Sequence, residues 1–206
     1  MSYFRPAEPK RKAPSSSNQP APKKKKKSKS VMLFDAIFEG NVENVRKVLE
    51  GIKDIKKIYS SNSGESPLHY IAAISKKLVE EKKATDEQCV EIAQLLVAKG
   101  IPKNYAIKPI TKKYKYAGAQ PIHFAKTPAM IDYLLDGDEV SIEAVDSAEW
   151  TPLFYAAFNE DVSLYDYWVE KGANVFHTDQ YDQNIFFILN LNLKNDREMF
   201  QQILND

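Results

Sequence analysis

Few side chains in this sequence could perform chemistry, and they are widely spaced. The 206 residues include three histidines, His69, His123 and His177, and one cysteine, Cys89. None of them has the short spacing by which His and Cys side chains bind a metal ion. Glycine-rich phosphate-binding patterns and serine nucleophile motifs are also absent from the sequence. We therefore expect no metal site, no cofactor and no enzymatic activity.

The paired acids and the cysteine have simpler explanations than catalysis. Asp136 and Asp138, and likewise Asp161 and Asp166, fit a solvated face better than a general acid and base. Cys89 falls on a predicted helix without a basic or histidine neighbour, so we expect it to be a packing residue. A lone cysteine forms no internal disulfide, which suits a reducing cytosol or nucleus.

The sequence pattern of residues 150–179 predicts the kind of secondary structure that positions these side chains. Thr151 can cap a helix, and Pro152 follows at the first helical position, where its missing N–H costs nothing. Apolar residues recur at three- and four-residue spacing on both sides of a break at 159–161, and Gly172 fits a C-terminal cap. The pattern predicts a helix hairpin, which must pack against other hairpins because it cannot bury both of its faces.

Copies of this hairpin occur along most of the chain. The other copies begin near Leu33, Ser66, Gln120 and Asn184, and Thr151 and Asn184 are 33 residues apart. That period, with Ser-Pro-Leu-His at residues 66–69 and Thr-Pro-Leu-Phe at 151–154, resembles the ankyrin-repeat family and its T-P-L-H-x-A motif. The resemblance covers residues 31–206.

This resemblance implies an all-α fold, an ankyrin-repeat solenoid of about five helix hairpins joined by β-hairpin-like fingers. The expected repeats are residues 31–60, 61–101, 117–140, 148–180 and 181–206. In this family the histidine of the motif bonds the backbone of its local turn, which is the role expected for His69 and His123. His177 would lie in a finger, exposed to solvent.

Three repeats depart from the regular pattern. The second has 13 extra residues between its motif histidine and its closing glycine, so we expect its first helix to extend by about three turns before a capping box at Thr85 and Gln88 starts the next helix. The third is shortened, and Thr127 begins a new helix there. In the fourth, Glu160 replaces the glycine between the helices, so this turn is either strained or shifted, in which case Asn159 adopts the positive φ angle instead.

The net charge of +1 hides a strong segregation along the chain. Residues 1–30 have ten basic groups and one acid, a net charge of +9. Residues 31–118 have fifteen basic and eleven acidic groups, and residues 119–206 have four basic and sixteen acidic groups, a net charge of −12. Such a chain presents surfaces of opposite sign to its partners.

Residues 1–30 form a basic tail that we expect to be disordered, because Pro, Ser and Lys leave almost nothing to bury. Two basic clusters separated by ten residues have the layout of a bipartite nuclear-import signal. The cluster residues are Arg11, Lys12, Lys23, Lys24, Lys25, Lys26 and Lys27. The predicted partner is a nuclear-import receptor and the predicted location is the nucleus, or cytoplasm and nucleus. The alternative is a solubilising or polyanion-binding tail.

A second candidate partner site combines the concave face of the stack with the loop at residues 103–116. The loop has five lysines, three tyrosines and no acid, so it is either an anchor for an acidic partner or a lid over the acidic fourth and fifth repeats. Large aromatic side chains on a concave surface usually provide binding energy. The predicted partner-binding residues are Tyr70, Lys112, Lys113, Tyr114, Lys115, Tyr116, Phe124, Trp150, Tyr155, Phe158 and Tyr181. Several of these aromatics could instead fill the core.

Two classes of function fit these features. The first is a monomeric, non-enzymatic protein-interaction module or adaptor, and the second is nucleic-acid or polyanion binding through the tail and the lysine–tyrosine loop. The acidic C-terminal half disfavours the second. The Lys-, Asn- and Ile-rich chain with irregular repeats is also similar to ankyrin effectors that intracellular bacteria deliver into host cells. No apolar run approaches the length of about 18 residues that predicts a membrane span.

Overall fold

The protein is a row of helix pairs stacked side by side. The computed structural model describes residues 27–60, 64–108 and 117–192. The elements are α1 (Lys29–Phe38), α2 (Val42–Glu50), the 3-10 turn η1 (Ile55–Lys57), α3 (Pro67–Glu80), α4 (Asp86–Ala98), the 3-10 turn η2 (Pro121–Phe124), α5 (Pro128–Leu135), α6 (Pro152–Phe158), α7 (Val162–Glu170) and α8 (Ile185–Asn192). The all-α prediction is confirmed for these residues, which contain no regular strand.

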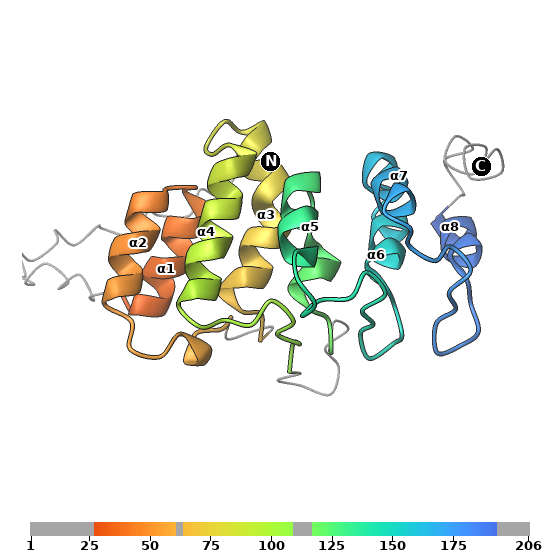
Figure 1. Ribbon diagram of the computed structural model, residues 1–206, viewed down its shortest axis with the longest axis horizontal. Coiled ribbons are helices and arrows are strands. Elements are labelled where there is room, and N and C mark those ends of the chain that lie inside the picture. Colours follow the sequence, from red (N-terminus) through yellow and green to blue (C-terminus); the bar gives the residue numbers. More distant parts are fainter. Residues whose placement is uncertain (1–26, 61–63, 109–116, 193–206) are drawn as a thin grey trace, which may run out of the picture.

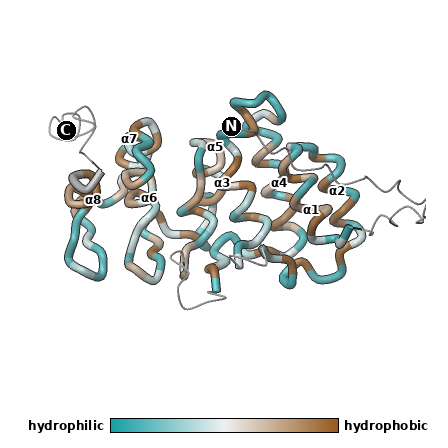
Figure 2. The backbone as a smooth tube through the Cα atoms, turned by 180° about the vertical axis from the view of Figure 1, so that it is seen from behind, coloured by the Kyte–Doolittle hydropathy of each residue, from teal (hydrophilic) through white to brown (hydrophobic). Residues whose placement is uncertain are grey.

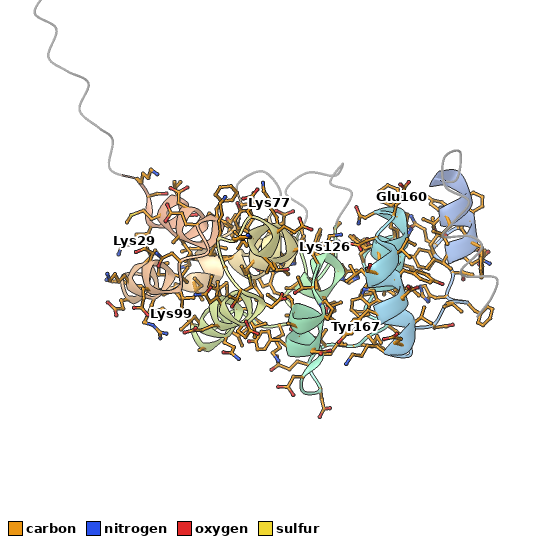
Figure 3. The ribbon with its side chains drawn as sticks, turned by 90° about the horizontal axis from the view of Figure 1, so that it is seen from above. Lys29, Lys77, Lys99, Lys126, Glu160 and Tyr167 are labelled. Atoms are coloured by element: carbon orange, nitrogen blue, oxygen red, sulfur yellow. The ribbon has the colours of Figure 1, made fainter. Side chains whose placement is uncertain are left out.

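The helices form two layers along the row. In one layer α1, α3, η2, α6 and α8 contact each other in sequence, and in the other α2 contacts α4 and α4 contacts α5. Figure 3, viewed from above, shows these layers on opposite edges of the stack, with α7 beside α6. The backbone coloured by hydropathy has its hydrophobic residues mostly within the helices and its hydrophilic residues mostly in the loops (Figure 2).

The predicted caps begin the helices. Ser66, Thr85, Thr127 and Thr151 each accept a hydrogen bond from the backbone N–H three residues further on, which satisfies one donor that a helix N-terminus leaves unpaired. At Thr85 the Gln88 side chain bonds back to the cap, so the predicted capping box is present. The predicted helix starts in the second to fourth repeats are therefore correct.

The extra length of the second repeat is shared between its two helices. α3 has 14 residues and α4 has 13, against 7 and 9 for α6 and α7 in the regular fourth repeat. The first helix therefore gains about two turns instead of three, and the second gains about one. In the third repeat, η2 is a four-residue 3-10 turn in place of an α-helix, as its predicted shortening requires.

The turn between α6 and α7 is strained at Glu160 and not shifted to Asn159. Glu160 itself has a positive φ of 56°, whereas Asn159 has φ −88° as the last residue before the turn. The side chain of Asn159 donates to the carbonyl of Tyr155 and stays on the helix. The next residue must then enter the left-handed region to start α7, although its side chain makes this costly.

Buried histidines join neighbouring repeats. Nδ1 of His69 accepts the N–H of Ser66 at 3.2 Å, and Nδ1 of His123 accepts the N–H of Gln120 at 3.0 Å, so the predicted local role is confirmed. On the other side of each ring, Nε2–H donates to a carbonyl of the following repeat, Ala119 or Trp150, at 3.1 Å. Each histidine therefore also holds the next repeat in register.

Candidate functional site

A cleft of about 480 Å³ lies on the α3–η2–α6–α8 layer, over the third to fifth repeats. Its walls come from η2, the following turn, α6, α8 and the two loops that project below the helices in Figure 1, residues 139–150 and 174–184. Most of its lining is apolar. The lining residues are His123, Phe124, Lys126, Asp146, Ala148, Trp150, Tyr155, Phe158, Asn159, Asp179, Tyr181, Gln183 and Ile188. Five of the predicted partner-binding residues thus surround one cleft.

Four of the lining aromatics pack on one another along the cleft. Phe124 and Tyr155 meet edge to face at 5.6 Å between ring centroids, and Tyr155 meets Trp150 in the same way at 6.0 Å. Phe158 lies 5.4 Å from Trp150 at the exposed end of the series. Such edge-to-face packing fixes the rings before any partner arrives, which reduces the entropy lost on binding.

Two buried aspartates, Asp146 and Asp179, shape the loops that form one wall. They are 33 residues apart, and Oδ1 of each accepts the backbone N–H groups two and four residues further on, at 2.8 to 3.0 Å. Their second oxygens hold cleft aromatics: Asp146 accepts the Tyr155 hydroxyl at 2.8 Å, and Asp179 accepts the Trp150 indole N–H at 3.2 Å. These loops are therefore ordered by carboxylate bonds.

The two loops are also joined to each other. The backbone N–H of Gln180 donates to the carbonyl of Ala148, and Nε2–H of His177 donates to the carbonyl of Glu149 at 2.7 Å. His177 was expected to be solvated, and it is half-buried because of this bond to the neighbouring loop. The predicted β-hairpin character appears in the described residues as one isolated bridge, between Thr178 and Asn184.

The predicted aromatics differ in their availability to a partner. Tyr181 is 71 % exposed and Phe158 is 45 % exposed, whereas Tyr155 is 6 % exposed and belongs to the core. Trp150 and Phe124 are half-buried and present part of their surface to the cleft. Tyr155 was expected on the binding face and instead supports it from below, because Asp146 holds its hydroxyl.

Tyr70 lies at a different place in the stack. It contacts Phe34 edge to face at 5.2 Å and lines a separate hollow between α1, α3 and the loop that follows η1. Burial, followed by the negative charge of Asp35, raises the pKa of its phenol. Tyr70 therefore does not join the other predicted residues in the cleft.

The lysine–tyrosine loop is described only at its start. Lys112, Lys113, Tyr114, Lys115 and Tyr116 lie outside the described residues, so their predicted contact with a partner stays a prediction.

Lys103, the first lysine of that loop, was expected to face water or an acidic partner. It is instead 9 % exposed, and its Nζ donates to the carbonyls of Tyr133 and Asp136 at 2.7 and 2.8 Å. The ammonium also lies 4.4 Å from the centroid of the Tyr133 ring. The carbonyl groups at the end of α5 carry a negative partial charge and pair with Lys103. An acidic side chain had been expected in this role.

The basic tail is described only at its end. Lys27 is exposed, and its ammonium pairs with Asp35 at 2.6 Å, which raises the pKa of the lysine. The other predicted import residues, Arg11, Lys12 and Lys23 to Lys26, lie outside the described residues. The import signal therefore stays a prediction.

The buried histidines and the buried cysteine have structural roles. Burial lowers the pKa of His69 to about 4 and also lowers that of His123, so both rings are neutral near pH 7. Burial raises the pKa of the Cys89 thiol to about 11, as fits a packing residue. The described ranges contain no group of three or more His, Cys, Asp or Glu side chains placed to bind a metal ion.

The three charged residues of the cleft were not among the predicted site residues. Asp146 and Asp179 have the same 33-residue spacing as the repeat itself, which was a usable signal. Lys126 has a weaker signal: it is one of only four basic residues in the acidic half. Asp161, assigned to a solvated face, caps α7 and pairs with Lys76 of α3 at 3.0 Å.

The chain matches no protein-family model, and no curated protein matches it. The described residues form a stack of helix hairpins with an aromatic cleft on one layer. In the described part of the chain, no helix is both long and apolar enough to pass through a membrane.

Proposed function

We propose that this chain is a non-enzymatic ankyrin-repeat interaction module that binds a segment of a partner protein in the aromatic cleft. The observation that carries the proposal is the cleft itself. It combines an apolar surface, preordered rings and two exposed aromatic anchors, Phe158 and Tyr181. A few large, well-placed aromatics commonly provide most of the binding energy of a protein interface.

The ankyrin assignment rests on the sequence motif and on repeated local geometry. The proposal is supported by the 33-residue spacing of Asp146 and Asp179 and by the histidines that bond the following repeat, because stacked repeats contact their neighbours in similar ways. The two aspartates and the histidine of the cleft, Asp146, Asp179 and His123, are already bonded within the fold, so none of them supports a role as a general acid or base.

The loop at residues 174–184 provides a matched pair of variants to test the cleft. Tyr181 and Phe176 are both exposed aromatics, at 71 % and 76 %, and only Tyr181 lines the cleft. Proteins captured from nuclear extract by the full chain should be lost with Tyr181→Ser and kept with Phe176→Ser. Equal capture by both variants and the native chain would show that the partner binds elsewhere.

We further propose that the basic tail brings the module to the nucleus. Residues 1–30 fused to a fluorescent reporter should accumulate in nuclei, and replacing Lys23 to Lys27 with alanine should spread the fusion evenly. As a control, alanine at Lys53, Lys56 and Lys57 in the full chain should leave its location unchanged. Unchanged nuclear accumulation of the tail variant would reduce the tail to a nonspecific cation.

Nucleic-acid binding through the tail and the lysine–tyrosine loop is the alternative function. Binding to phosphates weakens steeply between low and moderate salt, whereas binding in an apolar cleft changes little. Partner capture measured at about 50 mM and about 200 mM salt therefore separates the two functions.

A further inference from the structure

Lys126 lies in the turn between η2 and α5, at the edge of the cleft, and is half-buried there. Figure 3 shows it on the same edge of the stack as Glu160 and opposite Tyr167 of α7. Among the described residues its ammonium has neither a hydrogen-bond acceptor nor an ion-pair partner within contact distance, in contrast to the buried Lys103, which bonds two carbonyls. A buried cation without a partner is costly, so its retention calls for a reason.

The charges around Lys126 do not supply that partner. Asp161 is the acid whose charge acts on it, and that carboxylate already pairs with Lys76 at 3.0 Å and caps α7. Lys76 and Lys126 thus both act on one carboxylate, and only Lys76 pairs with it. Burial lowers the pKa of Lys126, with Asp161 opposing the change and Lys76 adding to it.

We propose that the cleft binds a peptide segment in which an acidic residue stands next to a large apolar one, with the carboxylate paired to Lys126 and the apolar side chain against Phe158 and Tyr181. The inference rests on the proposed interaction function and names the chemistry of its partner. It follows from the positions of the residues, because Lys126, Phe158 and Tyr181 line one continuous cleft. The two carboxylates of the lining, Asp146 and Asp179, each already accept three hydrogen bonds within the fold, whereas the ammonium of Lys126 bonds no described residue. An ammonium half removed from water binds a carboxylate more strongly than an exposed one.

The test is a peptide selection against the full chain. A displayed library of random twelve-residue peptides is panned on the immobilised protein, and enriched peptides are labelled and measured by fluorescence anisotropy. We expect enriched sequences with Asp or Glu beside an aromatic or large aliphatic residue. Replacing that acid with its amide should weaken binding about tenfold, or about 1.4 kcal/mol.

Variants of the protein assign this effect to Lys126. Lys126→Met should weaken the acidic peptide about tenfold and make the acid and the amide bind equally, while Lys126→Arg should retain the preference. Lys99, an exposed lysine on the opposite edge in Figure 3, provides the control variant Lys99→Met, which should bind as the native chain does. Lys126→Met should keep or raise the melting temperature, because it removes an unpaired half-buried charge.

The possible failures are distinguishable. Enrichment of Lys- or Arg-containing peptides, or an acid-to-amide change without effect, would overturn the assignment of an acidic partner and leave the cleft as a binding site. If no selected peptide binds more weakly to the Tyr181→Ser variant than to the native chain, the proposed function is overturned, and this inference with it.

Discussion

The buried histidine His69 should make the stability of the protein depend on pH in a way that one substitution can isolate. The ring is 1 % exposed and neutral, with Nδ1 accepting from Ser66 and Nε2–H donating to Ala119. His69→Phe keeps a ring of similar size, as Phe154 does at the matching position of the fourth repeat. It removes the partners of both backbone groups, and at pH 7.5 we expect a loss of about 3 kcal/mol.

The pH dependence follows from the lowered pKa of His69. Burial lowers this pKa from 6.5 to about 4, so below pH 6.5 the unfolded chain takes up a proton that the folded protein does not. The contribution of neutral His69 to the free energy of unfolding is complete above pH 6.5 and is lost as the pH falls toward 4. The loss is about 2.5 kcal/mol at pH 4.5. The Phe variant lacks this titrating ring, so the difference in the free energy of unfolding between the native chain and the variant should shrink to about 0.5 kcal/mol at pH 4.5.

Urea unfolding followed by tryptophan fluorescence at pH 7.5, 6.0 and 4.5 and constant ionic strength measures this difference. Because carboxylates titrate equally in both proteins, their contribution cancels. Thr151→Ala, which removes a helix cap and no titrating group, is the control and should cost about 1 kcal/mol at every pH. A cost of His69→Phe that stays constant, or grows as the pH falls, would refute the buried neutral histidine.

Three further predictions concern the backbone and the lysine loop. Glu160→Gly should raise the free energy of unfolding by about 0.5–1 kcal/mol, because glycine adopts the positive φ without strain; a loss in the same urea assay would contradict this. Lys103→Met should lower it by about 2 kcal/mol by leaving the last carbonyls of α5 without their donor, and an unchanged value would show that water replaces the ammonium. Reversing Lys112, Lys113 and Lys115 to Glu should abolish partner capture at an unchanged melting temperature if the loop is an anchor, and should lower that temperature if it is a lid; no change in either rejects both.

The helices and their starts were predictable because the signals are local. A Ser or Thr cap, a following proline at three of the four starts and three- to four-residue apolar spacing are contained within one turn or two, and they placed the start of α3, α4, α5 and α6 correctly. The local bond of the motif histidines was expected from the resemblance to the ankyrin family. Their second bond, to the next repeat, depends on how two hairpins stack, and no local pattern contains it.

The cleft was only partly predictable, because burial is decided by packing between repeats. The aromatics were correctly placed near one face, but whether Tyr155 is buried depends on Asp146, nine residues earlier in the chain. The burial of Lys103 depends on carbonyls 30 and 33 residues away, at the end of a helix. Lys126 became noticeable only when its neighbours in space proved to leave it unpaired.

The central claim, that a partner binds in the aromatic cleft, is tested most directly by hydrogen–deuterium exchange of the full chain with and without a captured partner. Binding in the cleft should slow the exchange at residues 121–126, 146–159 and 179–185, which carry most of the cleft lining. Exchange at α2 and α4, in the opposite layer, should stay unchanged. Protection confined to α2, α4 and α5, with no change at residues 146–159 and 179–185, would contradict the claim.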